Sequence, residues 1–468
     1  MQDAQDSLQP IASPYPPFRY AVLVIAILMV VTMLGQLDRN LPSLLVAPMR
    51  EAFDITDTQF SLFGGASFSL FYALLGPVFG GLVDRKHRPM LLIGGVLGWS
   101  LMTGLTAFTT SYWQILICRA GVGIGEAVLA PACYSLIADY VEPRRRGRAL
   151  AIYVIAIMAG GGASLILGGA LIEALSGASA LFGGMEPWRI VFLTVALPGP
   201  IAALLLLFVR EVPRQEQGHS AAVADPEEFR RYLSANRATF GFLIAGQVAL
   251  GLINNSIFPW MPSFFERSHG VEPHSAGLVL GSLMIGAGTV GLLIGGWLSD
   301  HWANTGAKGA RLRPMFVAAA IQIPALIVFP LIPSLTLSYA AIGLLFLGTS
   351  VTLAATPSMY QAVTPNRMRG RVVTLSLLAS GLIGWTLGPS ATAFITDYVF
   401  RDDAALRYAI LCVSMPSGLL FLFCSWRAFA PFVATNESLF GASQADEAIL
   451  DSDPAGTSPL VEAAAPAR

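Results

Sequence analysis

The sequence predicts an all-α polytopic membrane protein whose twelve transmembrane helices form two parallel-related six-helix bundles. Three observations support this fold class. Of the 468 residues, 54% are hydrophobic and only 12% are charged, which is too apolar for a soluble globular domain. Apolar stretches of about 20 residues recur along the chain. Two polar motifs of the first half also return in the second half.

The helix boundaries follow from windows of about 20 apolar residues, the length that crosses the hydrocarbon core of a bilayer. The expected spans are 20–46, 57–82, 89–109, 112–140, 148–175, 187–209, 238–264, 274–299, 313–333, 336–363, 371–398 and 405–428. The first span exceeds the apolar core of a signal peptide, so we expect it to be retained. The chain then divides into an N-terminal tail (1–19), a first bundle (20–209), a linker (210–237), a second bundle (238–430) and a C-terminal tail (431–468).

The linker and the C-terminal tail differ in character. In the linker, Asp225-Pro226-Glu227-Glu228 offers an N-cap, a proline at the first helical position and acids in the first turn. We therefore expect a short interfacial helix that ends near Asn236. The tail is rich in alanine, proline, serine and acidic residues and has few large apolar ones, a composition that predicts disorder over 431–468.

Basic residues gather in alternate loops. These loops contain Arg85, Lys86 and Arg88; Arg144, Arg145, Arg146 and Arg148; Lys308, Arg311 and Arg313; and Arg367, Arg369 and Arg371. The positive-inside rule makes this side cytoplasmic, and an even number of helices then puts both termini there. Nearly all of the 28 basic residues are arginine, a bias typical of GC-rich genomes, so we expect the inner (cytoplasmic) membrane of a bacterium.

Two of the expected helices carry charges where lipid cannot solvate them. The fourth contains Arg119 and Glu126, which share one helix face about 10 Å apart along the axis. The first contains Asp38 and Arg39. A charge at the membrane centre costs roughly 2.5–3.5 kcal/mol on insertion scales, and such residues usually face a bundle interior or a watery cavity. These four charges therefore mark the expected working site.

The two halves of the chain repeat each other. The loop 80–89 after the second helix contains Gly-Gly-Leu-Val-Asp, and the loop after the eighth contains Gly-Trp-Leu-Ser-Asp over 296–300. Likewise Arg-Gly-Arg at 146–148, entering the fifth helix, returns at 369–371, entering the eleventh. Parallel repeats of this kind place a substrate path between the halves and let access alternate by rocking one half against the other.

The loop motif and the repeat resemble the major facilitator superfamily, over nearly the whole chain outside the tails. The residues that match its loop signature, G-x-L-x-D-R-x-G-R-R, are Gly80, Leu82, Asp84, Arg85 and Arg88. The chain departs from the signature at His87 and Pro89. The second copy retains Gly296, Leu298 and Asp300 but loses the basic cluster. The resemblance implies the major facilitator fold.

The same resemblance implies a gate in the cytoplasmic loops. Asp84 is expected near the N-terminus of the eleventh helix, where the helix dipole favours a carboxylate. Arg88 is expected to pair with Asp139, the acid that ends the fourth helix. Such contacts would close the cytoplasmic side in the outward-facing state. The expected gating residues are Asp84, Arg85, Arg88, Asp139 and Asp300. The alternative is that they only solvate the loops and mark topology.

Within the superfamily, the helix charges resemble those of the spinster-type transporters. Those proteins share an Asp-Arg pair late in the first helix, matched by Asp38 and Arg39, and a fourth helix reading R-x-x-x-G-x-G-E-A, matched over 119–127. Organic-anion symporters share both features, and Pro131 fits them as well. The run Leu-Ile-Ala-Asp-Tyr over 136–140 favours the spinster type. That likeness implies an amphipathic, lipid-like or organic substrate; the alternative is a small carboxylate clamped by Arg39 and Arg119.

The expected chemistry is proton coupling by carboxylates. All five histidines lie in loops or at helix ends, so Asp38 and Glu126 are the mid-membrane proton carriers available, with Glu126 the first choice. Arg119 and Arg39 would neutralise the acids they touch, and a moving arginine would switch an acid between proton loading and release. The alternative is that Arg119 only forms a structural ion pair with Asp38 or Glu126.

Polar and aromatic residues in the helices that would border the central path suit an amphipathic ligand. The expected cavity residues are Asn40, Tyr72, Gln247, Asn254, Asn255, Trp260, Thr356, Tyr360 and Trp385. The sequence contains no zinc-ligand spacing and no phosphate-binding loop, so we expect no catalysis, no metal and no cofactor beyond a proton gradient. The expected partners are protons, a small-molecule or lipid-like substrate and membrane lipids, with no nucleic acid, and we expect a monomer.

Overall fold

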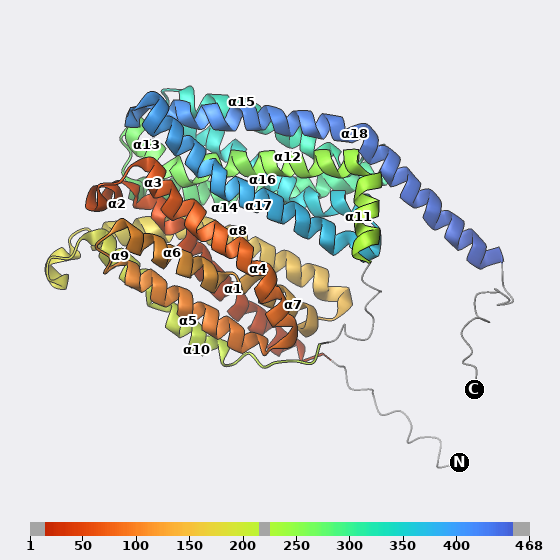
Figure 1. The fold of residues 1–468 in the computed structure, drawn as a ribbon, viewed down its shortest axis with the longest axis horizontal. Coiled ribbons are helices and arrows are strands. Elements are labelled where there is room, and N and C mark those ends of the chain that lie inside the picture. Colours follow the sequence, from red (N-terminus) through yellow and green to blue (C-terminus); the bar gives the residue numbers. More distant parts are fainter. Residues whose placement is uncertain (1–14, 215–224, 453–468) are drawn as a thin grey trace, which may run out of the picture.

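The computed structural model describes residues 15–214 and 225–452. Within these ranges the chain is helical, without strands, and contains 12 helices long and apolar enough to cross a membrane. The helices form two groups that lie side by side, one from each half of the chain (Figure 1). This arrangement confirms the predicted fold class.

The first group contains the elements up to residue 206. They are α1 (Phe18–Asn40), η1 (Leu41–Leu44), α2 (Val46–Phe53), α3 (Asp57–Ser61), η2 (Leu62–Ala66), α4 (Ser67–Arg85), α5 (Arg88–Thr106), α6 (Tyr112–Glu126), α7 (Leu129–Tyr140), α8 (Pro143–Leu175), η3 (Ala178–Phe182), α9 (Pro187–Ala196) and α10 (Pro198–Leu206).

The second group follows the linker helix α11 (Pro226–Ala235). Its elements are α12 (Arg237–Ile257), η4 (Phe258–Trp260), α13 (Met261–His269), α14 (Pro273–Asn304), α15 (Arg313–Leu331), α16 (Leu335–Ala362), η5 (Asn366–Met368), α17 (Arg369–Phe394), η6 (Ile395–Phe400), η7 (Asp403–Ala405) and α18 (Leu406–Ser452).

Prolines explain why two of the expected spans are interrupted. Pro42 has no amide hydrogen for the carbonyl of Asp38, and α1 gives way there to the 3₁₀ turn η1. Pro131 likewise leaves the carbonyl of Ala127 without its helical donor, and the fourth span divides into α6 and α7 directly after Glu126. Both interruptions lie beside the charged residues of the two helices.

The linker helix forms as the sequence predicts. Asp225 caps α11 by accepting a hydrogen bond from the amide of Glu227, and Pro226 is the first helical residue. The helix is anchored to the second group, because the hydroxyl of Tyr232 donates to the carbonyl of Val363 at 2.7 Å. Burial raises the pKa of Tyr232 to about 12, which keeps this hydroxyl a donor.

The C-terminal tail differs from its prediction. The last helix, α18, continues to Ser452, so the disorder expected from residue 431 is wrong over 431–452. Thr435 and Ser438 make hydrogen bonds in this extension, and Lys308 forms an ion pair with Glu437 at 3.9 Å. Residues 453–468 lie outside the described part of the chain. The composition of the tail was a poor guide to disorder, because alanine and glutamate, which are common in it, also favour helix.

Glycines join the two groups along α8 and α14. A Cβ built on Gly281 would lie 2.3 Å from the carbonyl oxygen of Gly162, and one on Gly169 would lie 2.8 Å from the carbonyl of His274. Only glycine permits this approach of one helix backbone to another. Figure 1 places α2, α3 and α13 together at one end of the molecule and α11 at the other. We call these the closed end and the linker end.

Candidate functional site

The charged residues of α1 and α6 meet in an ion pair between Arg39 and Glu126. The Nη2 atom of Arg39 lies 2.6 Å from Oε2 of Glu126, whose side chain is fully buried while that of Arg39 is 22% exposed. The second carboxylate oxygen of Glu126, Oε1, is buried and has no hydrogen-bond partner among the described residues. Glu126 is thus a buried acid paired with Arg39, whose side chain is partly exposed.

Arg119 donates its hydrogen bonds to the backbone of α1. Its Nη1 atom donates to the backbone carbonyl of Asp38 at 3.0 Å, and its Nη2 atom donates to the carbonyl of Arg39 at 2.9 Å. The carbonyl of Asp38 is the one that Pro42 leaves without a helical donor. Arg119 therefore caps the end of α1. The alternative, a structural ion pair of Arg119 with Asp38 or Glu126, is not among the described ion pairs.

Asp38 lies apart from the Arg39–Glu126 pair. Its Oδ1 atom accepts a hydrogen bond of 2.7 Å from the hydroxyl of Thr103 on α5, and the residue is 3% exposed. Adjacent helical residues point about 100° apart, which explains why Asp38 turns toward α5 while Arg39 turns toward Glu126. The structure brings the four predicted charges together at the junction of α1, α5 and α6.

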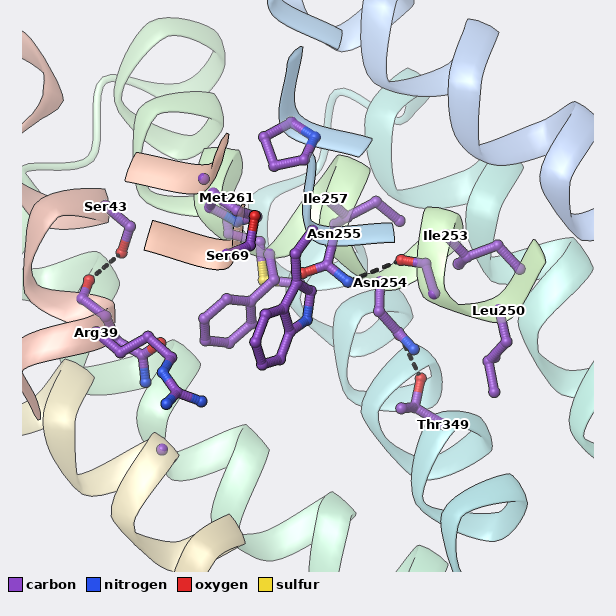
Figure 2. Close-up of a pocket in the computed structure, with 18 of the residues that line it drawn as sticks. Arg39, Ser43, Ser69, Leu250, Ile253, Asn254, Asn255, Ile257, Met261 and Thr349 are labelled. Carbon is purple, nitrogen blue, oxygen red and sulfur yellow. Dashed lines mark hydrogen bonds between the residues drawn. The ribbon is translucent and has the colours of Figure 1, made fainter. Parts of the chain in front are cut away.

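A cavity of about 520 Å³ lies between the two halves and touches this junction. Arg39 lines it from the first half, and Figure 2 shows Arg39 on one side of the cavity with Asn254 and Thr349 on the other. The predicted cavity residues that line it are Asn40, Gln247, Asn254, Asn255, Trp260, Thr356 and Trp385.

Two predicted cavity residues do not line it. Tyr360 is 1% exposed, and its hydroxyl bonds that of Ser376 at 2.6 Å inside the second bundle, so the prediction is wrong for this residue. Tyr72 is not among the lining residues and is stacked on Phe68, which is, with ring centroids 5.5 Å apart. A tyrosine satisfied by a neighbouring helix looks the same in sequence as one that faces a cavity.

Three aromatic rings surround the guanidinium of Arg39. Its central carbon lies 4.8 Å from the ring centroid of Phe68 and 5.2 Å from those of Tyr72 and Trp385. Rings at these distances attract a cation through their negative faces and leave it little water. Trp385 belongs to the second half of the chain, so Arg39 is held by both halves at once.

The opposite wall of the cavity is neutral and polar. The hydroxyl of Thr349 donates to Oδ1 of Asn254 at 2.8 Å, and Nε2 of Gln247 donates to the hydroxyl of Thr356 at 3.0 Å. On the side of Arg39, Asn40 donates to the hydroxyl of Ser164 at 2.9 Å. The cavity thus offers the cation Arg39 on one side and the amides of Gln247 and Asn254 on the other, with apolar and aromatic side chains between them. The acid Glu126 is buried behind Arg39.

An ionic network that the sequence reasoning missed holds the two halves together at the closed end. Arg267 clamps Asp57 with both terminal nitrogens, at 2.5 and 2.8 Å, and Asp57 is fully buried. Arg50 also reaches Asp57 at 3.1 Å and crosses to Asp403 at 2.7 Å. Asp397 accepts hydrogen bonds from the backbone and hydroxyl of Thr58. We call these residues the closed-end latch.

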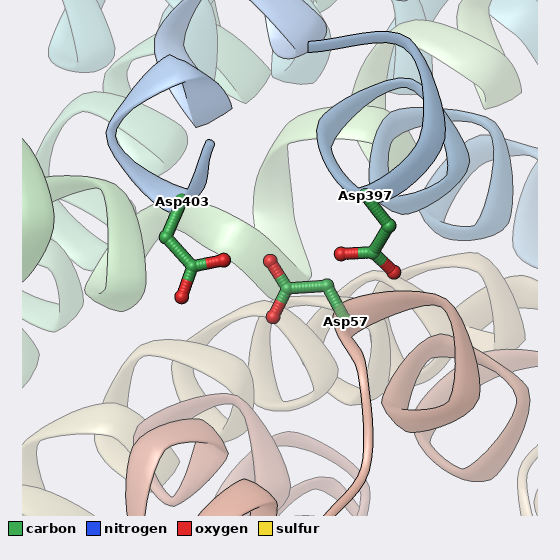
Figure 3. A group of neighbouring side chains, drawn as sticks. All are labelled: Asp57, Asp397 and Asp403. Atoms are coloured by element: carbon green, nitrogen blue, oxygen red, sulfur yellow. The ribbon is translucent and has the colours of Figure 1, made fainter. Parts of the chain in front are cut away.

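The three aspartates of the latch lie close enough together to suggest a metal site (Figure 3). Asp57 and Asp403 are paired with arginines, and Asp397 accepts from the backbone and hydroxyl of Thr58, so each carboxylate has a protein partner among the described residues. The signal that could have identified the latch is the presence of arginines on the side of the membrane where the positive-inside rule disfavours them.

At the linker end the predicted gating residues are only partly brought together. Arg88 is fully buried and pairs with Asp139, as predicted, and its Nε atom also lies 2.6 Å from Oε1 of Glu211, which was not predicted. Asp84 and Arg85 are exposed, and the structure gives neither an ion pair within the described residues. No hydrogen bond from α17 to Asp84 is among the described contacts.

In the second copy of the loop motif, an arginine further along the chain pairs with the motif's aspartate. Asp300 pairs with Arg311 at 2.6 Å, and Arg311 also donates to the hydroxyl of Ser299. The basic cluster that the motif lacks in the second half is thus replaced by one arginine across the loop.

The chain matches known proteins over most of its length. Residues 28–389 match the family model described as Major Facilitator Superfamily. An MFS-type efflux pump of Mycolicibacterium smegmatis is 27% identical over 417 residues, covering 88% of this chain and 94% of that protein. Protein spinster homolog 1 of Xenopus tropicalis is 26% identical over 430 residues, covering 84% of this chain and 78% of that protein.

A solved structure is similar in fold to most of the chain. It is that of a bacterial homologue of the human lysosomal transporter spinster, in an inward-facing and unoccupied conformation. The TM-score is 0.74 at 26% sequence identity, and the match covers 91% of this chain and 99% of the other. The spinster likeness stated from the helix charges is therefore confirmed.

Proposed function

The chain belongs to the Major Facilitator Superfamily, and from that premise we propose that it is a proton-coupled secondary active transporter that works by alternating access. The observation that carries the proposal is the ion pair between Arg39, which lines the cavity, and Glu126, which is buried behind it. Protonation of Glu126 would cancel its charge and release Arg39. The occupancy of the cavity and the protonation of Glu126 are then linked through one guanidinium.

The direction of this linkage follows from simple electrostatics. An anionic group in the cavity and the carboxylate of Glu126 compete for Arg39, so each favours the loss of the other. A substrate anion would bind best when Glu126 is protonated. Asp38, which bonds Thr103 instead of an arginine, is the second proton carrier in this proposal.

The proposed substrate is an amphipathic lipid-like or organic molecule with an anionic or zwitterionic group. The cavity supports this choice, because apolar and aromatic walls separate Arg39 from the amides at Asn254 and Gln247. The alternative is a small carboxylate moved with a proton, which Arg39 would bind by charge-assisted hydrogen bonds. Arg119 donates its hydrogen bonds to backbone carbonyls of α1. In this conformation, therefore, only Arg39 is available to bind the carboxylate of the alternative substrate.

The described conformation supports a gate at each end. The closed-end latch joins the halves, whereas Asp84 and Arg85 at the linker end are exposed. If the linker end is cytoplasmic, as the arginine-rich loops favour, this is an inward-facing state. We further propose the inner membrane of a bacterium, cytoplasmic termini and a monomer that needs only a proton gradient as its energy source.

The test uses purified protein in liposomes with an imposed pH gradient. Uptake and efflux of lysophosphatidylcholine and of a small carboxylate such as lactate are compared with and without a protonophore. We expect transport of one class to follow the gradient and Glu126→Gln to abolish that dependence. Glu173→Gln, which removes an exposed acid of α8, is the matched control and should behave like the parent. Transport indifferent to the gradient would refute proton coupling.

A further inference from the structure

A second cavity, of about 660 Å³, lies at the linker end of the second bundle, away from the transport cavity. It is bordered by the ends of α14 and α16, the start of α17 and the extension of α18. Its polar lining residues include Arg311, Gln361, Thr364, Asn366, Arg369 and Asn436.

The charge of this cavity has one sign. Arg311 and Arg369 are both in its wall, and its wall contains no aspartate or glutamate within the described part of the chain. Arg311 is partly neutralised by Asp300, at 2.6 Å, outside the wall. Arg369 donates from Nε to the carbonyl of Thr364 at 3.1 Å, which orients the guanidinium, and it forms no ion pair with the described residues.

Two buried polar atoms of residues in this wall have no hydrogen-bond partner among the described residues. Thr364 is 1% exposed, and its hydroxyl has no hydrogen-bond partner among the described residues. The Oδ1 atom of Asn436 is likewise buried without a partner. A buried hydroxyl without a hydrogen bond is unfavourable, so its presence in a cavity wall points to a ligand or solvent that completes it.

We propose that this cavity binds a phosphate-bearing anion, held by Arg369 and Arg311 and by the hydroxyl of Thr364. A phosphate oxygen accepts from both guanidinium and hydroxyl donors, and arginine forks match its geometry. Basic pockets between helices at a membrane surface are suited to anionic lipid headgroups, and a soluble phosphate offers the same oxygens. The amides of Gln361 and Asn366, at the rim, complete the donor set.

The position of the site suggests how a bound anion would affect the second bundle. Arg369 begins α17, the helix whose Trp385 packs against Arg39 of the first half. The same wall includes α18 and the end of α14, so a bound anion ties together three helices of the second bundle. Binding there would stiffen the linker end of this bundle without occupying the transport cavity.

The test measures binding and needs no transport assay. The full-length protein in detergent is titrated with inorganic phosphate, against chloride at equal ionic strength, and its thermal unfolding is followed. In a second arm the protein is placed in nanodiscs of phosphatidylcholine alone or of equimolar phosphatidylcholine and phosphatidylglycerol. We expect saturable stabilisation in at least one arm. A response to phosphate identifies a soluble anion as a ligand, and a response to phosphatidylglycerol identifies a lipid headgroup.

Matched variants decide whether the cavity is the site. Arg369→Gln should weaken the apparent affinity at least about tenfold, because it removes charge-assisted hydrogen bonds. Thr364→Val should weaken it less, and Arg313→Gln, an arginine of the same end that does not line the cavity, should leave it unchanged. Arg369→Lys, which retains the charge, serves if Arg369→Gln does not fold, and should also bind more weakly. Equal affinity in the parent and the Arg369 variant, or no stabilisation in either arm, would overturn the proposal.

Discussion

The role of Arg119 is decided by one missing backbone hydrogen. A proline at position 42 leaves the carbonyl of Asp38 without its donor four residues on, deep inside the protein. Arg119 supplies the hydrogen bond from α6 and, with its other terminal nitrogen, reaches the carbonyl of Arg39. These bonds hold the backbone at the end of α1, from which Asp38 and Arg39 project, so Arg119 supports the proposed proton site without an ion pair to an acid among the described residues.

A double-mutant cycle tests this dependence. Arg119→Gln should lower the free energy of unfolding by about 3 kcal/mol, since it removes two hydrogen bonds from a charged donor to buried carbonyls. In a Pro42→Ala background the new amide can satisfy Asp38 itself, so the cost of Arg119→Gln should be clearly smaller. Chemical unfolding of the four proteins in detergent measures the coupling. Additive effects would show that Pro42 and Arg119 do not act on the same carbonyl.

At the residue scale, the sequence identified the site but not its pairing. Four charges in two apolar stretches were enough to locate Asp38, Arg39, Arg119 and Glu126 together. Which arginine meets which acid depends on the rotation of α1 against α6, to which the 3₁₀ turn at Pro42 contributes, and helix periodicity does not specify it. Tyr360 shows the same limit, because its partner Ser376 is on a helix that adjoins it only in the fold.

At the scale of elements, the seam between α8 and α14 depends on backbone contact. Gly162 and Gly281 approach so closely that a single methyl group on either has no room. The sequence suggested that the glycines of the fifth helix serve packing, but it could not identify the partner helix. Apolar windows predicted all twelve spans. They did not predict that α1 ends at Asn40 and α6 at Glu126, because a proline can either kink a helix or end it.

Two alanine substitutions on one helix test the seam. Gly281→Ala places a methyl group 2.3 Å from the carbonyl oxygen of Gly162 and should destabilise the protein by about 1–3 kcal/mol, as overpacking does. Gly286→Ala, on the same helix, meets nothing within 4 Å and should be neutral or slightly stabilising. Thermal unfolding of both variants gives the comparison. Equal shifts would mean that the seam tolerates separation of α8 from α14.

At the scale of the whole molecule, the bonds between the halves are distributed unevenly. The latch residues Arg50, Asp57, Arg267 and Asp403 all lie at the closed end, and hydrogen bonds from Ser61 to Ser390 and between Ser69 and Thr386 continue the contact inward. A rocking motion that opens the closed end must break these bonds together. The latch thus favours the conformation with the closed end shut, and opening would separate the buried Asp57 from Arg267.

A reversible crosslink at the closed end tests alternating access directly. The hydroxyl oxygens of Ser61 and Ser390 are 3.2 Å apart across the two halves, so a Ser61→Cys, Ser390→Cys pair can form a disulfide after a small shift. The native cysteines to be replaced first are Cys118, Cys133, Cys412 and Cys424. Oxidation should stop transport in liposomes, because the halves can no longer separate at this end, and reduction should restore it.

The control for the crosslink lies within one half. The hydroxyl oxygens of Thr239 and Thr435 are 2.8 Å apart and both belong to the second bundle. A disulfide in a Thr239→Cys, Thr435→Cys protein adds the same covalent bond without joining the halves, so transport should continue after oxidation. If the oxidised Ser61→Cys, Ser390→Cys protein also continues to transport, the closed end need not open, and the substrate path does not require the two bundles to rock against each other.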